Sequence, residues 1–162
     1  MQSVVVEGID SSLFAPSSEE EILESMLIDY CYGLFHNNQL VAFCICIMNR
    51  KTKLSRSDLY ERNLCVWIKK GKKSYSDYIT FDTIQVLPEY RGYGIQRYFL
   101  KEAEELAAKA HANHIIATVA PDNTKSINSF EELEYCYNKD STIRIYNSRR
   151  YLMIKDIKGD MQ

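Results

Sequence analysis

The residues best suited to bind a ligand are Arg91, Gly92 and Gly94, which lie between a predicted strand and a predicted helix. The first N–H groups of a helix have no intrahelical partner, and the helix dipole adds about half a positive charge there, so an anion is favoured. Glycine has no Cβ, which lets the main chain approach a ligand closely. Arg91 adds a positive charge. The segment therefore predicts an anion-binding turn.

This turn lacks the patterns of other glycine-rich phosphate sites. No Gly-Lys-Ser/Thr follows it, and the sequence contains no Gly-x-Gly-x-x-Gly, so neither a P-loop nor a dinucleotide site is indicated. The alternative is an ordinary tight turn without a ligand.

A carboxylate on the strand before the turn is the candidate for acid–base chemistry. The strand predicted over residues 78–87 places Phe81, Thr83, Gln85 and Leu87 on one face and Asp82, Ile84 and Val86 on the other. Asp82 would then lie close to the turn, where it could act as a base. The alternative is a strand carboxylate that is only hydrogen-bonded or solvated.

The segments after the turn predict two helices and a parallel strand. Apolar side chains repeat every three or four residues over residues 95–110, which indicates an amphipathic helix. Residues 114–119 form the next strand, and because a helix intervenes, it should run parallel to residues 78–87 through a right-handed crossover. Asp122 or Asn123 can cap a second helix, whose apolar face carries Ile127, Phe130 and Leu133.

The remaining segments complete a single domain over residues 1–162. Ser17 and Glu20 have the spacing of a capping box at the start of a first helix. Residues 30–35 and 39–48 predict an antiparallel hairpin, and residues 135–138 and 151–157 predict two final strands. Residues 50–76 form an insertion of uncertain structure, and its lysine cluster, 69–73, has the features of an exposed turn.

The five cysteines do not indicate a disulfide framework, because they are odd in number and irregularly spaced. Cys44 and Cys46 lie two residues apart in an apolar strand, so both should face the core. A metal site is the alternative, but no second Cys or His pair at ligand spacing completes it. We therefore expect no metal.

Composition excludes several classes of protein. The formal charge of -2 leaves no positive footprint for bulk nucleic-acid binding. No run approaches the roughly 18 apolar residues of a membrane span, and residues 1–14 lack the features of a secretory signal. We therefore expect a cytoplasmic protein with neither a nucleic-acid nor a membrane partner.

The order of strand, Arg-Gly-x-Gly turn, amphipathic helix, strand, Asn-x-x-Ser and second helix resembles the GNAT N-acetyltransferase superfamily. In the family turn, Gln/Arg-x-x-Gly-x-Gly/Ala, Arg91 and Gly94 match the first two fixed positions, while Gln96 stands at the third. Residues 123–135 are similar to the family's Asn-x-x-Ala-x-x-x-Tyr-Glu-x-Leu-Gly-Phe in length and apolar pattern. The resemblance covers residues 78–135 well and the outer segments through element order.

The resemblance implies an α/β (α+β) GNAT fold, with a central mixed, mostly antiparallel sheet of six to seven strands and helices on both faces. Strands 78–87 and 114–119 would splay apart, and the pantetheine arm of acetyl-CoA would insert between them. The diphosphate would bind the main chain of the turn, Asn123 would hydrogen-bond the pantetheine, and Ser126 would let the coenzyme pass close. The residues implied to bind the coenzyme are Ile84, Val86, Arg91, Gly92, Tyr93, Gly94, Ile95, Gln96, Asn123, Ser126 and Phe130.

The implied reaction is direct attack of a neutral amine on the thioester, with the N–H near Val86 stabilising the oxyanion. Asp82 is the candidate base. Phe130 stands where many members have the tyrosine that protonates the departing thiolate. Tyr135 or Tyr137 could replace that acid, although packing on a strand is the alternative for both, and the thiolate could also leave unassisted.

The sequence therefore predicts an acetyl-CoA-dependent N-acetyltransferase acting on a primary amine of a small molecule or peptide. The alternative is a catalytically weak acyl-CoA-binding sensor or scaffold, to which Phe130 lends weight. The identity of the acceptor does not follow from these residues. Dimerisation is common in similar proteins, but no local feature specifies an interface, so a homodimer stays open.

Overall fold

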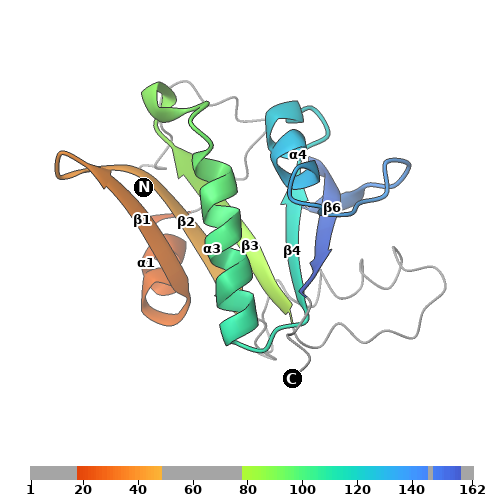
Figure 1. Cartoon of the computed structure of the whole chain (residues 1–162), viewed down its shortest axis with the longest axis horizontal. Coiled ribbons are helices and arrows are strands. Elements are labelled where there is room, and N and C mark those ends of the chain that lie inside the picture. The colour runs from red at the N-terminus through yellow and green to blue at the C-terminus, as the bar shows by residue number, and fades with distance from the viewer. Residues whose placement is uncertain (1–17, 49–77, 146–147, 158–162) are drawn as a thin grey trace.

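The structure, a computed structural model, describes residues 18–48, 78–145 and 148–157. Ser17 of the predicted capping box and the predicted insertion over residues 50–76 lie outside the described residues. The elements in chain order are α1 (Glu19–Ile28), β1 (Tyr30–His36), β2 (Gln39–Met48), β3 (Tyr78–Val86), the short 3-10 helix η1 (Pro88–Tyr90), α3 (Ile95–Lys109), β4 (His114–Val119), α4 (Thr124–Glu131), β5 (Ile143–Ile145) and β6 (Ser148–Asp156) (Figure 1).

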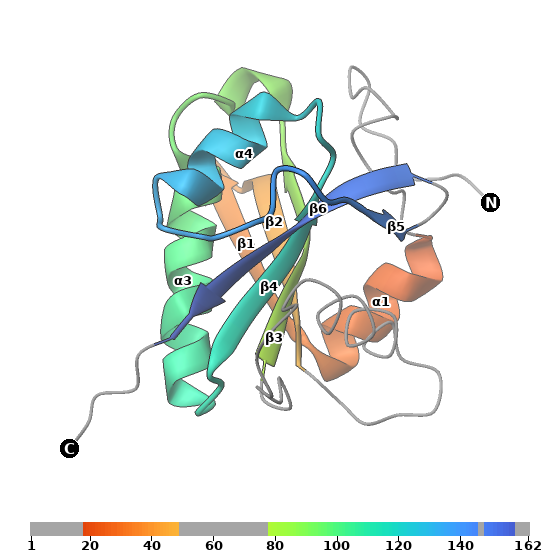
Figure 2. The same ribbon diagram turned by 90° about the vertical axis from the view of Figure 1, so that its right-hand side faces the viewer.

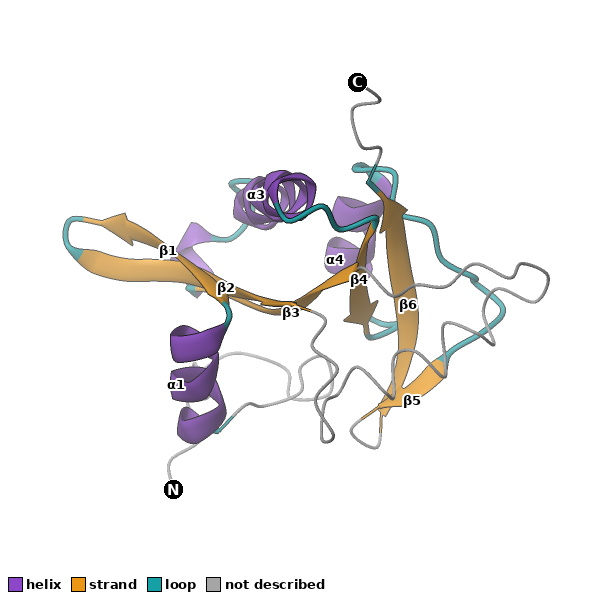
Figure 3. Cartoon of the chain, turned by 90° about the horizontal axis from the view of Figure 1, so that it is seen from below, coloured by secondary structure: helices purple, strands orange, loops and turns teal. Residues whose placement is uncertain are grey.

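Six strands form one mixed sheet in the order β1-β2-β3-β4-β6-β5. β3 and β4 are parallel, and the other neighbouring pairs are antiparallel. Helices α3 and α4 cover one face of the sheet and α1 lies on the other (Figures 2 and 3). The predicted mixed, mostly antiparallel sheet with helices on both faces is therefore confirmed.

The C-terminal strands differ from the prediction. Residues 135–138 contribute only an isolated bridge between Cys136 and Ile154, so the strand predicted there is wrong. β5 was not predicted, and it pairs with residues 148–150. This added pairing explains why β6 begins at Ser148 rather than at residue 151.

The predicted β1–β2 hairpin is confirmed, with a tighter turn than expected. β1 includes His36, so only Asn37 and Asn38 connect the strands. Both asparagines have positive φ, 49° and 62°, as a two-residue turn that matches the strand twist requires. Asparagine adopts this backbone conformation more readily than most residues.

The main hydrophobic core lies between the sheet and helices α3 and α4. Its buried residues include Phe99, Leu100 and Ala103 of α3 and Phe130 of α4. Cys44 and Cys46 are 0% exposed and belong to the same cluster, which confirms their predicted packing role.

Among the described residues, no three His, Cys, Asp or Glu side chains lie close enough together to hold a metal. Within the same part of the chain, no helix is long and apolar enough to cross a membrane.

A β-bulge at Asp82 changes which side chains of β3 share a face. Ile45 pairs with Thr83 and Cys46 with Phe81, so Asp82 has no opposite residue on β2. An extra residue in one strand shifts the alternation of side chains by one position. Phe81, Ile84 and Val86 therefore contribute to one hydrophobic cluster, and the prediction that Phe81 faces away from Ile84 and Val86 is wrong.

Candidate functional site

The sheet opens into a wedge between β3 and β4. Their parallel pairing runs from Tyr78–His114 to Phe81–Ala117 and then stops, although β3 continues to Val86 and β4 to Val119. On their outer sides both strands stay paired, β3 with β2 and β4 with β6. Figure 1 shows the two strands diverging toward η1 and α4. Residues 82–86 and 118–119 thus line an edge that lacks a strand partner among the described residues.

The main chain of β3 directs Ile84 and Val86 toward this wedge. Leu87 N–H donates to the Val41 oxygen of β2 at 2.9 Å. Because successive residues of a strand point their N–H and C=O groups to opposite edges, Val86 and Ile84 direct theirs away from β2. The structure therefore places the two residues predicted to pair with a coenzyme arm at the open edge.

The glycine-rich turn lies at the end of β3 and leads into α3. Gly92 and Gly94 have φ of 84° and 77°, a left-handed conformation that glycine adopts without steric penalty. Gly94 is the N-cap of α3 and has no side chain with which to cap the helix. The first N–H groups of this 15-residue helix are the kind of donor that binds an anion.

Arg91 connects the turn to the wedge. Its Nε donates to the Val86 oxygen at 3.1 Å, so the guanidinium lies against the end of β3. Tyr93 of the turn is 78% exposed, and Ile95 packs against the main hydrophobic cluster. The positive charge predicted at the turn therefore stands beside the open edge of the sheet.

A second guanidinium near the turn was not predicted. Arg97 lies in the first turn of α3, and its Nη2 is 3.3 Å from where a Cβ on Gly94 would stand. It forms an ion pair with Glu132 at the end of α4. Arg97 follows Gly94 by three residues, and this spacing could have indicated a second positive charge at the turn.

The start of α4 lies beside the start of α3. Asn123 accepts a hydrogen bond from the Ser126 N–H at 3.2 Å, as the predicted helix cap requires. Ser126 Oγ in turn accepts from Gln96 Nε2 at 2.8 Å. The structure thus joins Asn123 and Ser126 to Gln96, which lies 30 positions before Ser126 in the chain.

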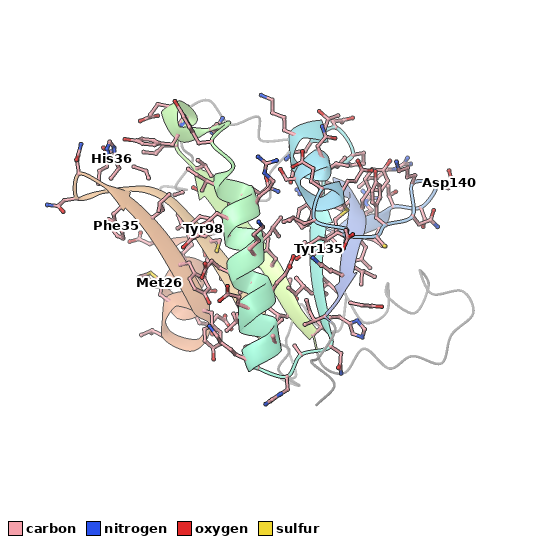
Figure 4. The ribbon with its side chains drawn as sticks, viewed as in Figure 1. Met26, Phe35, His36, Tyr98, Tyr135 and Asp140 are labelled. Atoms are coloured by element: carbon pink, nitrogen blue, oxygen red, sulfur yellow. The ribbon has the colours of Figure 1, made fainter. Side chains whose placement is uncertain are left out.

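The hairpin braces the segment that enters the turn, a contact that was not predicted. His36 Nδ1 lies 2.8 Å from the hydroxyl of Tyr90 in η1, and the rings meet edge to face at 5.7 Å. Figure 4 shows His36 at the tip of the hairpin. The position of η1 therefore depends on a strand pair far away in sequence.

A row of aromatic rings leads from the wedge into the core. Phe130 meets Phe81, the last residue of β3 that pairs with β4, at 6.3 Å. It meets Tyr135 at 4.9 Å, and both contacts are edge to face. Phe130 is 2% exposed, so it offers packing and no hydroxyl at this position.

Tyr135 places a buried hydroxyl at the end of this row. The residue is 4% exposed, and its hydroxyl has no hydrogen-bond partner within the described part of the chain. Figure 4 shows its side chain pointing from the β4 side toward α3. Burial, followed by the negative charge of Glu104, raises the pKa of Tyr135. The phenol therefore stays protonated at neutral pH.

An ion pair lies over Tyr135. Lys155 of β6 contacts Glu104 of α3 at 2.8 Å, and its Nζ lies 5.6 Å from the centre of the Tyr135 ring. Both side chains are mostly shielded, at 19% and 24% exposure. The pair links α3 to β6 beside the Tyr135 ring.

The second tyrosine named as a replacement acid is engaged elsewhere. Tyr137 donates its hydroxyl to Glu131 at 3.0 Å on the exposed side of α4. Burial, followed by the hydrogen bond to Glu131, raises the pKa of Tyr137. Tyr135 is therefore the better placed of the two.

Asp82 occupies the first position of β3 beyond the last β3–β4 pair. Thr83 Oγ1 donates to its Oδ2 at 3.0 Å. The bulge leaves Asp82 at the narrow end of the wedge rather than in the regular alternation from which it was predicted. Its carboxylate thus lies where the two strands begin to separate.

The histidines near β4 lie at the opposite end of the ladder. His114 pairs with Tyr78, and its Nδ1 contacts Asp156 at 2.9 Å. His111 ends the turn after α3 with φ of 55°. Both histidines therefore lie on the side away from the glycine turn.

Comparison with known proteins agrees with this geometry. The model of the Acetyltransferase (GNAT) family matches residues 8–135. Comparison with curated proteins gave no significant match.

Solved structures with the same fold have low sequence identity to the chain. A GNAT-family acetyltransferase from Streptococcus pneumoniae is 14% identical, with 88% of this chain and 78% of that chain covered and a TM-score of 0.58. The ribosomal-protein-S18-alanine N-acetyltransferase of Escherichia coli is 18% identical, with 94% and 86% covered and a TM-score of 0.60. A Bacillus subtilis acetyltransferase in complex with CoA is 12% identical, with 87% and 85% covered and a TM-score of 0.60.

Proposed function

The chain belongs to the acetyltransferase (GNAT) family, and from this premise we propose that it transfers an acetyl group from acetyl-CoA to a primary amine of a small molecule or peptide. The observation that carries the proposal is the wedge between β3 and β4, which opens below the glycine-rich turn. A thioester carrier has both features that this arrangement would bind, an amide-containing arm and a diphosphate.

The arm would lie in the wedge as an additional strand. Ile84 and Val86 direct their main-chain groups to this edge, and Asn123 lies at the start of α4 beside it. The diphosphate would bind the N–H groups of residues 92–96, where the helix dipole and the charge of Arg91 favour an anion. The N–H of Arg91 itself donates to the Pro88 oxygen at 3.2 Å. Gly92 and Gly94 keep the main chain accessible to it.

The reaction would be a direct attack in a ternary complex. The neutral amine attacks the thioester carbonyl, the C–N bond forms, and the tetrahedral oxyanion accepts a hydrogen bond from a main-chain N–H on the open edge of β3. Val86, expected from the sequence to supply it, lies at the wide end of the wedge, four residues from Asp82, so the Ile84 N–H is nearer to the base. Collapse of this species breaks the C–S bond and releases the CoA thiolate. Asp82, at the narrow end of the wedge, would accept the proton that the ammonium must lose before attack or that the amine loses after it.

Tyr135 would be the acid for the thiolate, in place of the phenol that Phe130 lacks. Its hydroxyl has no partner within the described residues and is protonated at neutral pH. Burial raises the pKa of Tyr135, which makes the phenol a weaker acid toward the thiolate, so the support for this role is its position. The edge-to-face contact with Phe130 connects it to the residue at the narrow end of the wedge, Phe81. A rescue experiment tests this role: Tyr135→Phe should lower kcat, and adding Phe130→Tyr should restore part of it.

The second candidate function is an acyl-CoA sensor or scaffold with little catalytic activity. Phe130 favours it, because the fully packed ring leaves no hydroxyl at that position of α4. Both candidates need the same coenzyme site and differ only in the release of thiol.

Calorimetry with acetyl-CoA, followed by thiol-release assays over small amines and peptides, tests both candidates. We expect binding by the wild-type chain and loss of binding in Arg91→Glu, which places a negative charge beside the diphosphate. Release of thiol with one acceptor class supports the enzyme. Binding without release for any acceptor favours the sensor, and absence of binding refutes both.

The acceptor, the assembly and the location are also part of the proposal. We expect α1, the β1–β2 hairpin and the insertion over residues 50–76 to select the amine, because they are the elements outside the coenzyme site. We expect residues 1–162 to act as one cytoplasmic domain, and a homodimer is one assembly to measure.

A further inference from the structure

Two side-chain contacts tie the first turn of α3 to α4. Gln96 Nε2 donates to Ser126 Oγ at 2.8 Å, and the neighbouring Arg97 forms an ion pair with Glu132. We call these four residues the α3–α4 clasp. They are separated by 30 and 35 positions in the sequence, so the contacts hold the two helices to each other rather than shaping either one.

The clasp crosses the path that a coenzyme would follow. α3 and α4 lie on the same face of the sheet and flank the wedge between β3 and β4 (Figures 1 and 3). A carrier with its arm in the wedge and its diphosphate at residues 92–96 passes between the starts of these helices. The Gln96–Ser126 hydrogen bond joins those two starts.

We propose that the clasp is a gate that is closed in the free protein and must open for acetyl-CoA to enter. This inference rests on the proposed function and adds a determinant of coenzyme affinity to it. The closed state lowers the apparent affinity, because only the open fraction of molecules can bind.

The two residues that form the hydrogen bond of the gate, Gln96 and Ser126, both differ from the GNAT family pattern. Gln96 stands where the pattern has Gly or Ala, and Ser126 stands where it has Ala. Neither small residue can form the side-chain hydrogen bond seen here. The two departures from the pattern contact each other, which explains why a long side chain is accommodated at position 96.

Opening of the gate would also change the charge at the turn. Glu132 holds its carboxylate beside Arg97, whose guanidinium lies against Gly94. When the ion pair separates, the negative charge leaves and Arg97 becomes available to the diphosphate. The pair is about half exposed, at 46% and 53%, so salt should weaken this part of the effect.

Calorimetry of the full chain with acetyl-CoA tests the gate. Gln96→Ala and Ser126→Ala should each lower Kd by about three- to tenfold, the range that one net hydrogen bond allows. The double variant should gain no more than either single one, since each removes the same contact. Melting temperatures without ligand show that all three variants are folded.

Two variants that remove the same charge test the ion pair between Arg97 and Glu132. Glu132→Gln should lower Kd by about two- to fivefold at low salt. Glu131→Gln removes a carboxylate from the adjacent position, but Glu131 pairs with Lys139 and Tyr137 rather than with α3. It should leave Kd nearly unchanged, which separates opening of the clasp from a general charge effect.

The rates of association and dissociation show what causes the higher affinity of the variants for acetyl-CoA. Stopped-flow measurements should show faster association for Gln96→Ala, because a larger fraction of molecules is open. Unchanged or weaker binding by Gln96→Ala, or a gain wholly from slower dissociation, overturns the gate while the coenzyme site stands. Absence of binding in the wild type and in every variant overturns the gate and the proposed function together.

Discussion

Replacement of Tyr135 by phenylalanine should stabilise the fold, which is unusual for a change at a buried residue. The hydroxyl is buried and has no hydrogen-bond partner within the described residues, so folding removes it from water without compensation. Burial of such a group costs about 1–3 kcal/mol. The variant keeps the ring contact with Phe130 at 4.9 Å and loses only the oxygen.

We expect the free energy of unfolding to rise by about 1 kcal/mol, and by no more than about 3 kcal/mol. For a chain of this size, each kcal/mol corresponds to about 2–4 °C in Tm. Urea unfolding and a thermal scan at pH 7 measure both quantities. Tyr137→Phe is the matched control: it removes a hydroxyl that is bonded to Glu131, so its stability should stay the same or fall.

The same variant should change the response to alkaline pH. Because the folded state raises the pKa of Tyr135 above the ordinary value of 10.0, the unfolded chain releases this proton first as pH rises. Stability therefore falls above about pH 10, by up to about 1.4 kcal/mol per pH unit for one proton. Tyr135→Phe should remove this share of the decline, while the effect is absent at pH 7.

A loss of more than about 1 kcal/mol on Tyr135→Phe would refute this reasoning, because it would show that the hydroxyl has a partner in the folded protein. A buried water is the simplest such partner. A gain in stability together with a fall in kcat would support the role of acid. A gain in stability with unchanged kcat would leave the phenol as a packing residue.

Three further changes test separate parts of the structure. Asp82→Asn should lower kcat and remove the part of its pH dependence that comes from the base, while acetyl-CoA still binds. An unchanged pH–rate profile would contradict the assignment of Asp82 as the base. Gly94→Ala should destabilise by about 1–2 kcal/mol in urea unfolding, because of the positive φ, and should weaken coenzyme binding; equal stability would mean that the turn adopts another conformation. Glu104→Gln should lower stability by about 1–3 kcal/mol, because it leaves the shielded Lys155 without its charged partner. Glu105→Gln removes the carboxylate from an exposed ion pair with Lys109 and should change stability by less than about 0.5 kcal/mol; equal losses would show that burial does not distinguish the two pairs.

Local pattern was enough to predict the elements that build the candidate site. The alternation of residues 78–86, the helical repeat after Gly94 and the cap at Asn123 each depend on residues within a few positions of one another. These preferences act over short range, so the strand, turn and helix follow from them directly. The parallel pairing of β3 and β4 also followed, because a crossover helix constrains the direction of the next strand.

The errors lie where pairing between distant segments overrides the local pattern. The alternation of β3 fails at Asp82, because the register with β2 inserts one extra residue there. Residues 135–138 favour a strand by composition, but only Cys136 finds a partner on β6. Neither feature is visible in a window of neighbouring residues.

The sequence by itself determined that this chain has a glycine-rich turn between a strand and an amphipathic helix, together with the family pattern around it. Only the tertiary structure decided where β3 and β4 separate, which is beyond Phe81, and that Gln96 reaches Ser126. It also decided that Arg97 lies beside Gly94 while pairing with Glu132, and that the Tyr135 hydroxyl is buried with no partner among the described residues. The physical reason is the separation in sequence over which each kind of interaction acts. Local conformational preferences act between neighbours in sequence, whereas register, side-chain contact and burial depend on which distant surfaces pack together.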